Sequence, residues 1–293
     1  MENNGIPLVN VPMGPGSQDE GDMVLDYMKM PSEMASYDIP VLPEAEQAAD
    51  CPQALAVMEL LQKALETYRV GDDTAKIMLS SLADKDRALL NQILGEGEVS
   101  ISIQGNQKLV AQETVLAGVW WIRELNENDG SLKDEFLEVA DVPAMVRTYA
   151  FEEARPMRLT EPALPQDVLN APSVLVEISD ASQAYIALKE EGFAGSTPHV
   201  INLSLLPFSP QDHLYLSEVT GTGAVTVLSR GYGNCRITST RVEGLWRVQY
   251  YNSTDQLILD TLEITDVPLV ACAAQEDLGD SAERLHEIRE VMV

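Results

Sequence analysis

The sequence contains two similar stretches about 126 residues apart, and this repetition constrains the fold more than any other feature. GEGEVSI (95–101) corresponds to GTGAVTV (221–227), GVWWI (118–122) to GLWRV (244–248), and LEVADVP (137–143) to LEITDVP (262–268). The first two pairs share one offset, and the third differs from it by a single residue. Three blocks in the same order at nearly constant spacing indicate an internal duplication.

Hydrophobic periodicity predicts the same series of elements in both copies. The series is a helix, a short strand, a helix, a meander of about four antiparallel strands, and a helix. In the first copy we expect helices over 52–68 and 83–94, and strands near 77–79, 99–103, 109–116, 118–125 and 132–140. In the second copy we expect helices over 172–190 and 210–219 and a strand over 200–206 before the second meander.

The helices that follow the meanders are predicted from capping residues. Asp141-Val142-Pro143 is expected to start one helix, with Asp141 as its N-cap, and Asp266-Val267-Pro268 to start its counterpart. Ser281 is expected to cap a last helix. Segregated helices and antiparallel strands predict an α+β fold, with the two copies in a pseudo-twofold arrangement.

The predicted organisation has four segments. Residues 1–50 carry ten acids and one Lys without sustained periodicity, which predicts a disordered acidic arm. The first unit is expected over 51–154, a Pro-rich linker over 155–171, and the second unit over 172–293. Six of the eleven methionines lie in the arm. Because Met adapts to irregular surfaces, Met23, Met28 and Met30 are candidate partner contacts, the alternative being an inert tail.

Charge restricts the class of partner. The 19 Lys and Arg against 47 Asp and Glu give a formal charge of −28. Such a protein is repelled by phosphate backbones and anionic membranes, so we expect no nucleic-acid partner and no membrane insertion. The sequence shows neither an apolar run of about 20 residues nor a basic-then-apolar N-terminus. Three widely separated cysteines fit a reducing compartment, so we expect a cytoplasmic protein.

The sequence offers no motif for metal or cofactor chemistry. CxxC, CxxH and HExxH are absent, as are phosphate loops and the orders of residues typical of hydrolases. We expect no cofactor, no metal and no enzymatic activity. Cys235 is predicted to lie on the inward-facing side of its strand, the alternative being a thiol or cluster-handling role. Cys272 is interpreted in the same way. Cys51, beside the arm, is expected to be accessible.

A few residues are candidates for partner contacts. Trp120 and Trp246 are paired by the repeat and are expected to fill the sheet cores, whereas Trp121 points to the opposite face. An exposed Trp121 would be a binding anchor, although cover by a helix is the favoured interpretation. The other candidates are the turn Gly231, Tyr232, Gly233 and Asn234, and the acidic helix start Gln275, Glu276 and Asp277.

The second copy also carries a family resemblance. GYGNCRI, WRVQYYNS, LEITDVP and AAQEDLGDSAERL resemble the C-terminal region of the HupH/HyaF hydrogenase expression/formation proteins. LLNQILGEGEVSI in the first copy and the early MGPGSQ are similar to the same family. The resemblance implies an accessory protein that matures an uptake [NiFe] hydrogenase by binding its immature small, iron–sulfur subunit before assembly and export. It also implies a thioredoxin-like co-chaperone as a second partner.

Two other functions remain open from the residues. One is an iron–sulfur or redox carrier that uses Cys235 and Cys272. The other is a structural adaptor within a larger maturation complex.

Overall fold

The computed structural model describes residues 48–292, apart from 106–107, 127, 156, 158–163, 193–196 and 231–233. These residues belong to one compact unit. Residues 1–47, with Met23, Met28 and Met30, lie outside the described residues, and so do Gly231, Tyr232 and Gly233.

The first half of the described chain holds three helices and five strands. These are α2 (Pro52–Thr67), β1 (Lys76–Met78), α3 (Asp84–Leu94), β2 (Val99–Ile103), β3 (Lys108–Glu113), β4 (Val119–Leu125), β5 (Leu132–Val139) and α4 (Ala144–Tyr149). The second half has a similar order, but a 3-10 turn stands where the first half has α4, and a further helix follows it. Its elements are α5 (Ala171–Glu190), β6 (His199–Asn202), the 3-10 turn η1 (Leu203–Leu205), α6 (Pro210–Thr220), β7 (Val225–Ser229), β8 (Asn234–Ser239), β9 (Leu245–Tyr251), β10 (Leu257–Ile264), the 3-10 turn η2 (Leu269–Ala271) and α7 (Gln275–Met292).

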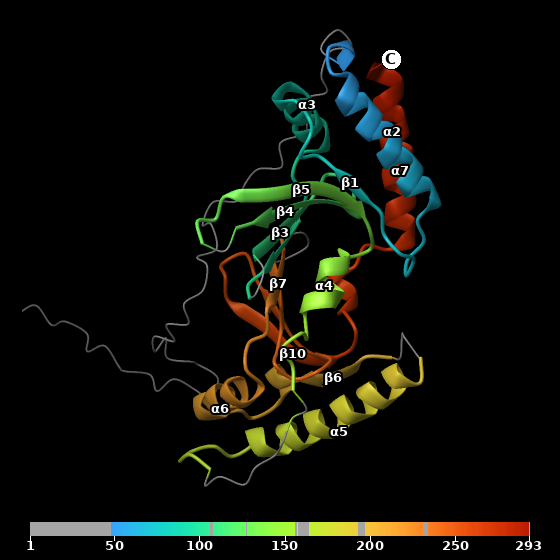
Figure 1. Ribbon diagram of the computed structural model, residues 1–293. Coiled ribbons are helices and arrows are strands. Elements are labelled where there is room, and N and C mark those ends of the chain that lie inside the picture. Colours follow the sequence, from blue (N-terminus) through green and yellow to red (C-terminus); the bar gives the residue numbers. More distant parts are fainter. Residues whose placement is uncertain are drawn as a thin grey trace, which may run out of the picture. The chain divides into compact units, whose positions relative to one another are not determined.

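The ten strands form one antiparallel sheet in the order β1-β5-β4-β3-β2-β7-β8-β9-β10-β6. The order of elements is therefore the same when the sheet is traced inward from either edge. At the centre, β2 pairs with β7 so that Ile101 lies opposite Val227, and the register is symmetric about this pair. The fold is α+β, as predicted, and the strands of both halves share one sheet (Figure 1).

The two faces of the sheet are covered differently. The inner face carries Ile101, Ala111, Ile122, Ile237 and Val248, which are all buried. Helix α4 and the residues after it cover this face, where Phe151 contacts Trp246 edge-on with ring centroids 5.3 Å apart (Figure 1).

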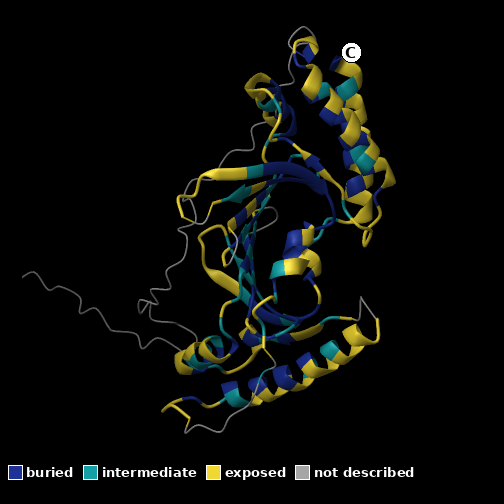
Figure 2. Ribbon diagram, in the orientation of Figure 1, coloured by how far each residue is buried: buried dark blue, intermediate teal, exposed yellow. Residues whose placement is uncertain are grey.

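On the opposite, outer face, helices cover only the two ends of the sheet. Arg87 of α3 forms an ion pair with Glu135 of β5, at 3.1 Å, and Ser217 of α6 accepts a hydrogen bond from Arg247 of β9. Figure 2 shows the helices buried on one side and exposed on the other, as amphipathic helices are.

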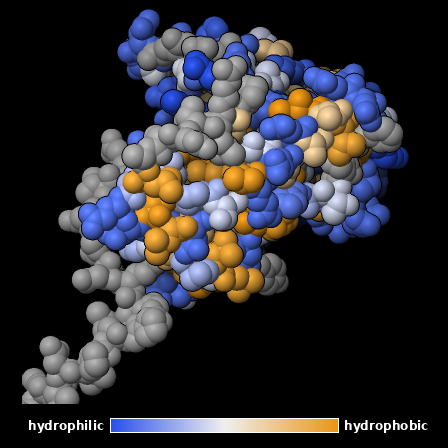
Figure 3. Space-filling model, turned by 90° about the horizontal axis from the view of Figure 1, so that it is seen from below, coloured by the Kyte–Doolittle hydropathy of each residue, from blue (hydrophilic) through white to orange (hydrophobic). Residues whose placement is uncertain are grey.

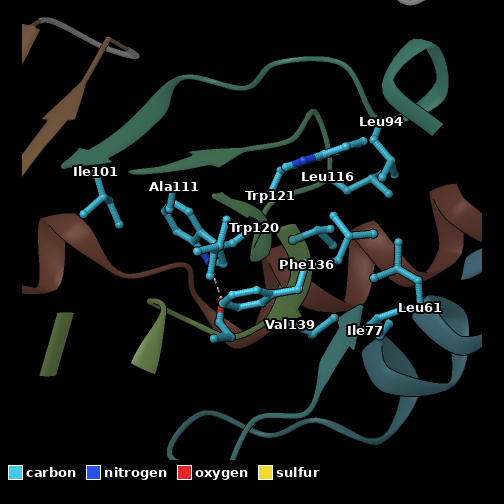
Figure 4. Close-up of a cluster of buried hydrophobic side chains, with 14 of the residues drawn as sticks. Leu61, Ile77, Leu94, Ile101, Ala111, Leu116, Trp120, Trp121, Phe136 and Val139 are labelled. Atoms are coloured by element: carbon cyan, nitrogen blue, oxygen red, sulfur yellow. Dashed lines mark hydrogen bonds between the residues drawn. The ribbon is translucent and has the colours of Figure 1, made fainter. Parts of the chain in front are cut away.

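The tryptophans occupy the places that the repeat predicts. Trp120 and Trp246 are 1% and 0% exposed, and each indole N–H donates to a backbone carbonyl, of Ala140 and Asp266 respectively, at 3.0 Å. Trp121 lies on the outer face beneath helical cover and donates to Oε1 of Glu135 at 2.7 Å (Figure 4). Buried indoles need such partners for their N–H groups.

Helix α7 crosses from the second half to the first. Its Ser281 hydroxyl donates to the carbonyl of Ala117 at 3.0 Å, and the side chain of Gln62 on α2 donates to the carbonyl of Ala282 at 3.1 Å. Leu278 lies against the turn at Gly118, where φ is +75° and a Cβ atom would lie only 2.2 Å from the leucine. Only glycine accommodates both this φ and this close approach.

Several local predictions were wrong at element ends. Helix α4 begins at Ala144 after Pro143 without a side-chain cap, because Asp141 binds other groups. The Asp266 segment forms only η2, not a helix. Ser281 lies inside α7, because its hydroxyl is used in packing rather than capping.

Two further predictions were corrected. The strand expected over 200–206 ends at Asn202, where η1 turns the chain. Cys51 is 6% exposed rather than accessible, because the sulfur packs against α3, where it lies 3.8 Å from the carbonyl of Lys85.

Candidate partner-binding site

The start of α7, proposed from the sequence as a partner contact, also holds the helix in place. Gln275 Oε1 accepts a hydrogen bond from the backbone N–H of Val70 at 3.0 Å, which ties α7 to the end of α2. Asp277 accepts from the N–H of Ala274 at 3.2 Å, and Glu276 is exposed. Two of the three side chains therefore have intramolecular roles.

Asn234 is the part of the predicted turn that the structure describes. It begins β8, and its amide donates to Asp255 Oδ1 at 3.2 Å. Asn234 thus contacts the β9–β10 turn, whereas Gln275 contacts the end of α2. The described contacts place the two candidate segments against different elements.

Burial disfavours the thiolate form of two cysteines, Cys235 and Cys272. Cys235 is buried opposite Tyr250, and burial raises its pKa to about 11. Cys272 is half-buried with its sulfur 3.7 Å from the carbonyl of Pro268, and burial together with the nearby Asp141 raises its pKa to about 12. Metal binding and nucleophilic chemistry need the thiolate. Within the described ranges, no group of three or more His, Cys, Asp or Glu could hold a metal ion.

A polar cluster joins the two halves beside α4. Asp141 Oδ1 accepts from the hydroxyl of Tyr68 at 2.7 Å, and its Oδ2 accepts from Arg147 at 2.8 Å. Arg147 also donates to Asp266 Oδ2 at 3.0 Å. Burial opposes ionisation of Asp141, but these hydrogen bonds outweigh it and hold the pKa below its ordinary value. The repeated Asp-Val-Pro is the sequence signal for this cluster, and the shared arginine lies outside the repeat.

A buried carboxyl lies under the start of α7. Glu113 accepts a hydrogen bond from the N–H of Gly118 at 3.0 Å. Burial raises its pKa to about 7, and the nearby carboxylates of Glu98 and Asp277 add to the rise. Perturbed acids often mark functional sites, but here α7 covers the group. No sequence pattern indicates this group, because Glu98, Glu113 and Asp277 come together only in the folded chain.

Exposed leucines gather where α5, η1 and α6 begin. Leu169 and Leu205 are 74% and 80% exposed, and Leu206 and Leu214 are also exposed. Hydrogen bonds hold this region together: the Asn170 amide donates to the carbonyl of Pro207 at 2.7 Å, and the N–H of Leu169 donates to Asp212 at 2.8 Å. We name these four leucines the α5–α6 patch, and Figure 3 shows apolar side chains on the face that carries α5 and α6.

An exposed apolar group of this kind is typical of a protein–protein contact. Sequence reasoning missed it because the strand predicted over 200–206 would have placed Leu205 within the sheet. No helix among the described residues is long and apolar enough to cross a bilayer.

The comparisons with known proteins all find hydrogenase-related proteins. The family model "HupH hydrogenase expression protein, C-terminal conserved region" matches residues 52–157 and 168–292. The "Hydrogenase expression/formation protein HupQ" of Azotobacter chroococcum mcd 1 is 56% identical over 95% of each chain. The "Hydrogenase-1 operon protein HyaF" of Escherichia coli (strain K12) is 31% identical over 94% of each chain.

One solved structure is also similar, the hydrogenase expression protein HupH from Thiobacillus denitrificans. It is 25% identical, covers 40% of this chain and 92% of its own, and has a TM-score of 0.36, too low to support any structural argument. The family match covers most of the chain, and the sequence relatives match it over nearly their full length. The chain therefore belongs to the HupH family of hydrogenase expression/formation proteins.

Proposed function

We propose that this chain is a non-catalytic, cytoplasmic maturation factor that binds the immature small, iron–sulfur subunit of an uptake [NiFe] hydrogenase before assembly and export. The observation that carries the role in maturation is the 56% identity over 95% of the chain to a hydrogenase expression/formation protein. The names of the relatives describe expression and formation rather than a reaction. The small subunit as client, and a thioredoxin-like co-chaperone as second partner, rest on the family resemblance.

The α5–α6 patch is the contact surface that we propose for the client. Its leucines offer apolar area without a further cover among the described residues, and apolar anchors supply most of the affinity at protein interfaces. The net charge of −28 would guide a basic client toward the chain. Shielding of surfaces around the cluster sites until assembly is the mechanism that we propose.

Binding of the purified small-subunit precursor to the full chain tests the proposal. Leu169→Asp with Leu205→Asp should weaken binding at least about tenfold, because both exposed anchors are lost. Leu132→Asp, at a position 48% exposed on β5, is the matched control and should bind as the original chain does. Equal affinity of all three proteins would exclude the patch. Failure of the original chain to bind the precursor at all would exclude the client.

The N-terminal arm is proposed as an auxiliary contact. Deletion of residues 1–47, or replacement of Met23, Met28 and Met30 by Ser, should speed dissociation, because methionines supply adaptable apolar contacts. Association should slow as salt rises, because exposed charges are screened beyond about 8 Å at 0.15 M. If association does not depend on salt and dissociation does not depend on the arm variants, the folded part of the chain makes the whole contact.

The raised pKa values of both cysteines speak against the alternative of an iron–sulfur or redox carrier. Cluster absorbance in anaerobically purified protein that Cys235→Ser abolishes would favour the carrier. Co-purification with accessory proteins alone, never with the small subunit, would favour the structural adaptor.

We also propose that the two halves arose by duplication and are related by a pseudo-twofold axis through the Ile101–Val227 pair. Corresponding groups support this proposal. Asp86 of α3 and Asp212 of α6 each bind backbone N–H groups at the start of a long helix. The two units, 51–154 and 172–293, and the linker 155–171 follow from it. Superposition of residues 97–143 on 223–268 in an experimental structure, with the two buried tryptophans coincident, tests the duplication.

A further inference from the structure

The centre of the outer sheet face has no helix over it in the described part of the chain. The most extensive helix–sheet contacts are those of α2 with β1 and β5 and of α5 with β10, and α6 reaches β9 through Ser217. The four central strands β2, β3, β7 and β8 pair with other strands. Side chains of β8 alternate between half-buried and buried, and so do those of β7 over Val225–Leu228. The half-buried side chains point to the outer face. This face is therefore accessible between α2 and α3 at one end of the sheet and α5 and α6 at the other.

Small polar side chains line this strip. The register places Ser102 opposite Val110 of β3 and Thr226 of β7, and Thr226 opposite Thr238 of β8. Val110 is 37% exposed. Hydroxyl groups can donate to carboxylates, and short side chains let another backbone come close. The strip is therefore shaped to accept an extended chain.

Cations flank the strip although the protein is strongly acidic. Lys108 on β3, Arg123 on β4, Arg236 on β8 and Arg230 just after β7 share the outer face by alternation. Arg123 binds Glu135 through Nε at 3.2 Å, and the guanidinium of Arg236 lies over the ring of Tyr251, 5.8 Å from its centroid. A guanidinium has five N–H groups, so each can donate to a further partner as well. Among the described residues, the acids beside these four cations are Glu98, opposite Arg230, and Glu135, which binds Arg87 and Arg123, so cations outnumber acids here in a chain of charge −28.

We propose that the strip between the two helix pairs is a second docking surface and binds an acidic, extended segment of a partner protein. We name it the cationic strip and define it by Ser102, Lys108, Arg123, Thr226, Arg230 and Arg236. Charge complementarity selects a carboxylate-bearing peptide, since Arg pairs with carboxylates in bidentate geometry. Nucleic acid is disfavoured, because its dense phosphate charge would meet the negative remainder of the molecule.

The spacing of the strands sets the length of the segment. Three strand spacings of about 4.8 Å separate β3 from β8, so Lys108 and Arg236 lie on strands roughly 14 Å apart. The register also offsets Lys108 from Arg236 by four residues along the strands, about 13 Å, so the two residues lie roughly 20 Å apart. An extended peptide advances about 3.3 Å per residue, so acids about six residues apart would reach both cations. The surface lies apart from the α5–α6 patch and does not depend on the proposed client.

A labelled twelve-residue polyglutamate peptide is the probe, followed by fluorescence anisotropy with the full chain. The strip variant carries Lys108→Gln, Arg230→Gln and Arg236→Gln. The matched control carries Lys63→Gln, Arg284→Gln and Arg289→Gln on α2 and α7 and changes the net charge equally. We expect the original chain and the control to bind alike and the strip variant at least about tenfold more weakly, with binding decreasing as salt rises.

Urea denaturation of both variants checks that they fold. Lys108→Gln alone, at an exposed position, is the milder variant and should weaken binding about two- to fivefold. Equal loss in the strip variant and the control would show that net charge alone acts, and would overturn the proposal. So would the absence of peptide binding by the original chain at low salt, or binding of a single-stranded oligonucleotide instead of the peptide.

Discussion

Replacement of Asp212 by Ala should be among the most destabilising single changes in this protein. The carboxylate is fully buried, and its Oδ1 accepts hydrogen bonds from the backbone N–H groups of Leu169, Asn170 and Ala171 at 2.8–2.9 Å. Its Oδ2 accepts from the N–H of Ser209 at 3.0 Å. The substitution leaves four backbone donors without an acceptor. At about 1 kcal/mol of net loss for each, unfolding should become easier by about 3–5 kcal/mol.

Asp86→Ala is the matched control, because Asp86 occupies the corresponding place in the first half. It is also buried, but among the described residues one backbone donor, the N–H of Ala54, binds its carboxylate at 2.9 Å. We therefore expect a loss of only about 1–2 kcal/mol. Urea denaturation at pH 7, followed by tryptophan fluorescence, measures both values, because all three tryptophans are buried.

The pH dependence gives a second readout. Burial alone would raise the pKa of Asp212, but the backbone hydrogen bonds outweigh it and hold the pKa far below its usual range. A carboxyl with a lowered pKa stabilises the fold above its unfolded pKa of about 3.9 and loses that contribution as the pH falls. The gap between the original chain and Asp212→Ala should therefore narrow below about pH 4, by up to about 1.4 kcal/mol per pH unit. A loss no larger than that of Asp86→Ala, or a gap unchanged from pH 6 to pH 3, would refute this reasoning.

Three further changes test other parts of the structure. Gly244→Ala should lower the free energy of unfolding by about 2–4 kcal/mol, since φ is +76° and the new Cβ would lie 2.5 Å from Tyr185. Gly192→Ala, with φ of +81° in open space, should lower it by only about 1 kcal/mol in the same denaturation assay. Cys235→Ser should cost about 1–3 kcal/mol through an imperfectly paired buried hydroxyl, and the native thiol should react slowly with iodoacetamide at pH 8, because its pKa is raised to about 11. When the pKa of a carboxyl is raised in the folded state, the protein loses stability as the pH rises through the folded value, here about 7. Glu113→Gln should therefore stabilise the protein by about 1–3 kcal/mol at pH 8 and have little effect at pH 5. Equal costs for the two glycines, rapid alkylation of the thiol, or a pH-independent effect of Glu113→Gln would each contradict the corresponding argument.

The sequence was sufficient for those elements whose residues alternate clearly. Val99, Ile101 and Ile103 alternate with polar residues, and β2 lies where this pattern predicts it. The capping box at Ser209 likewise marks the start of α6. In both cases the decisive interactions are local, so residues close together in the sequence specify them.

Other features depend on contacts between distant residues and could not be predicted. The 18 residues of α7 show an apolar face, but nothing in the sequence indicates that Ser281 meets Ala117 in the other half, 164 residues away. The raised pKa of Glu113 likewise depends on distant contacts, because it comes chiefly from burial in the folded chain, and the carboxylates of Glu98 and Asp277 add to it. Leu205 is exposed because η1 ends the strand early, and the run VINLSLL gave no turn signal.

The differences between the two halves bear more directly on function than their similarities. In the first half α7 seals the turn at Gly118, and in the second half α5 itself fulfils this task, with Ser182 donating to the carbonyl of Glu243 at 2.7 Å. An additional helix, α7, thus buries part of the surface of the first half.

The second half has no such helix, and its exposed leucines lie where α5 and α6 begin. Burying a leucine side chain is favourable by about 1.5–3 kcal/mol, so the exposure of these four leucines costs stability. An exposed apolar patch of this kind is where we expect a partner, and for this reason the client experiment targets Leu169 and Leu205.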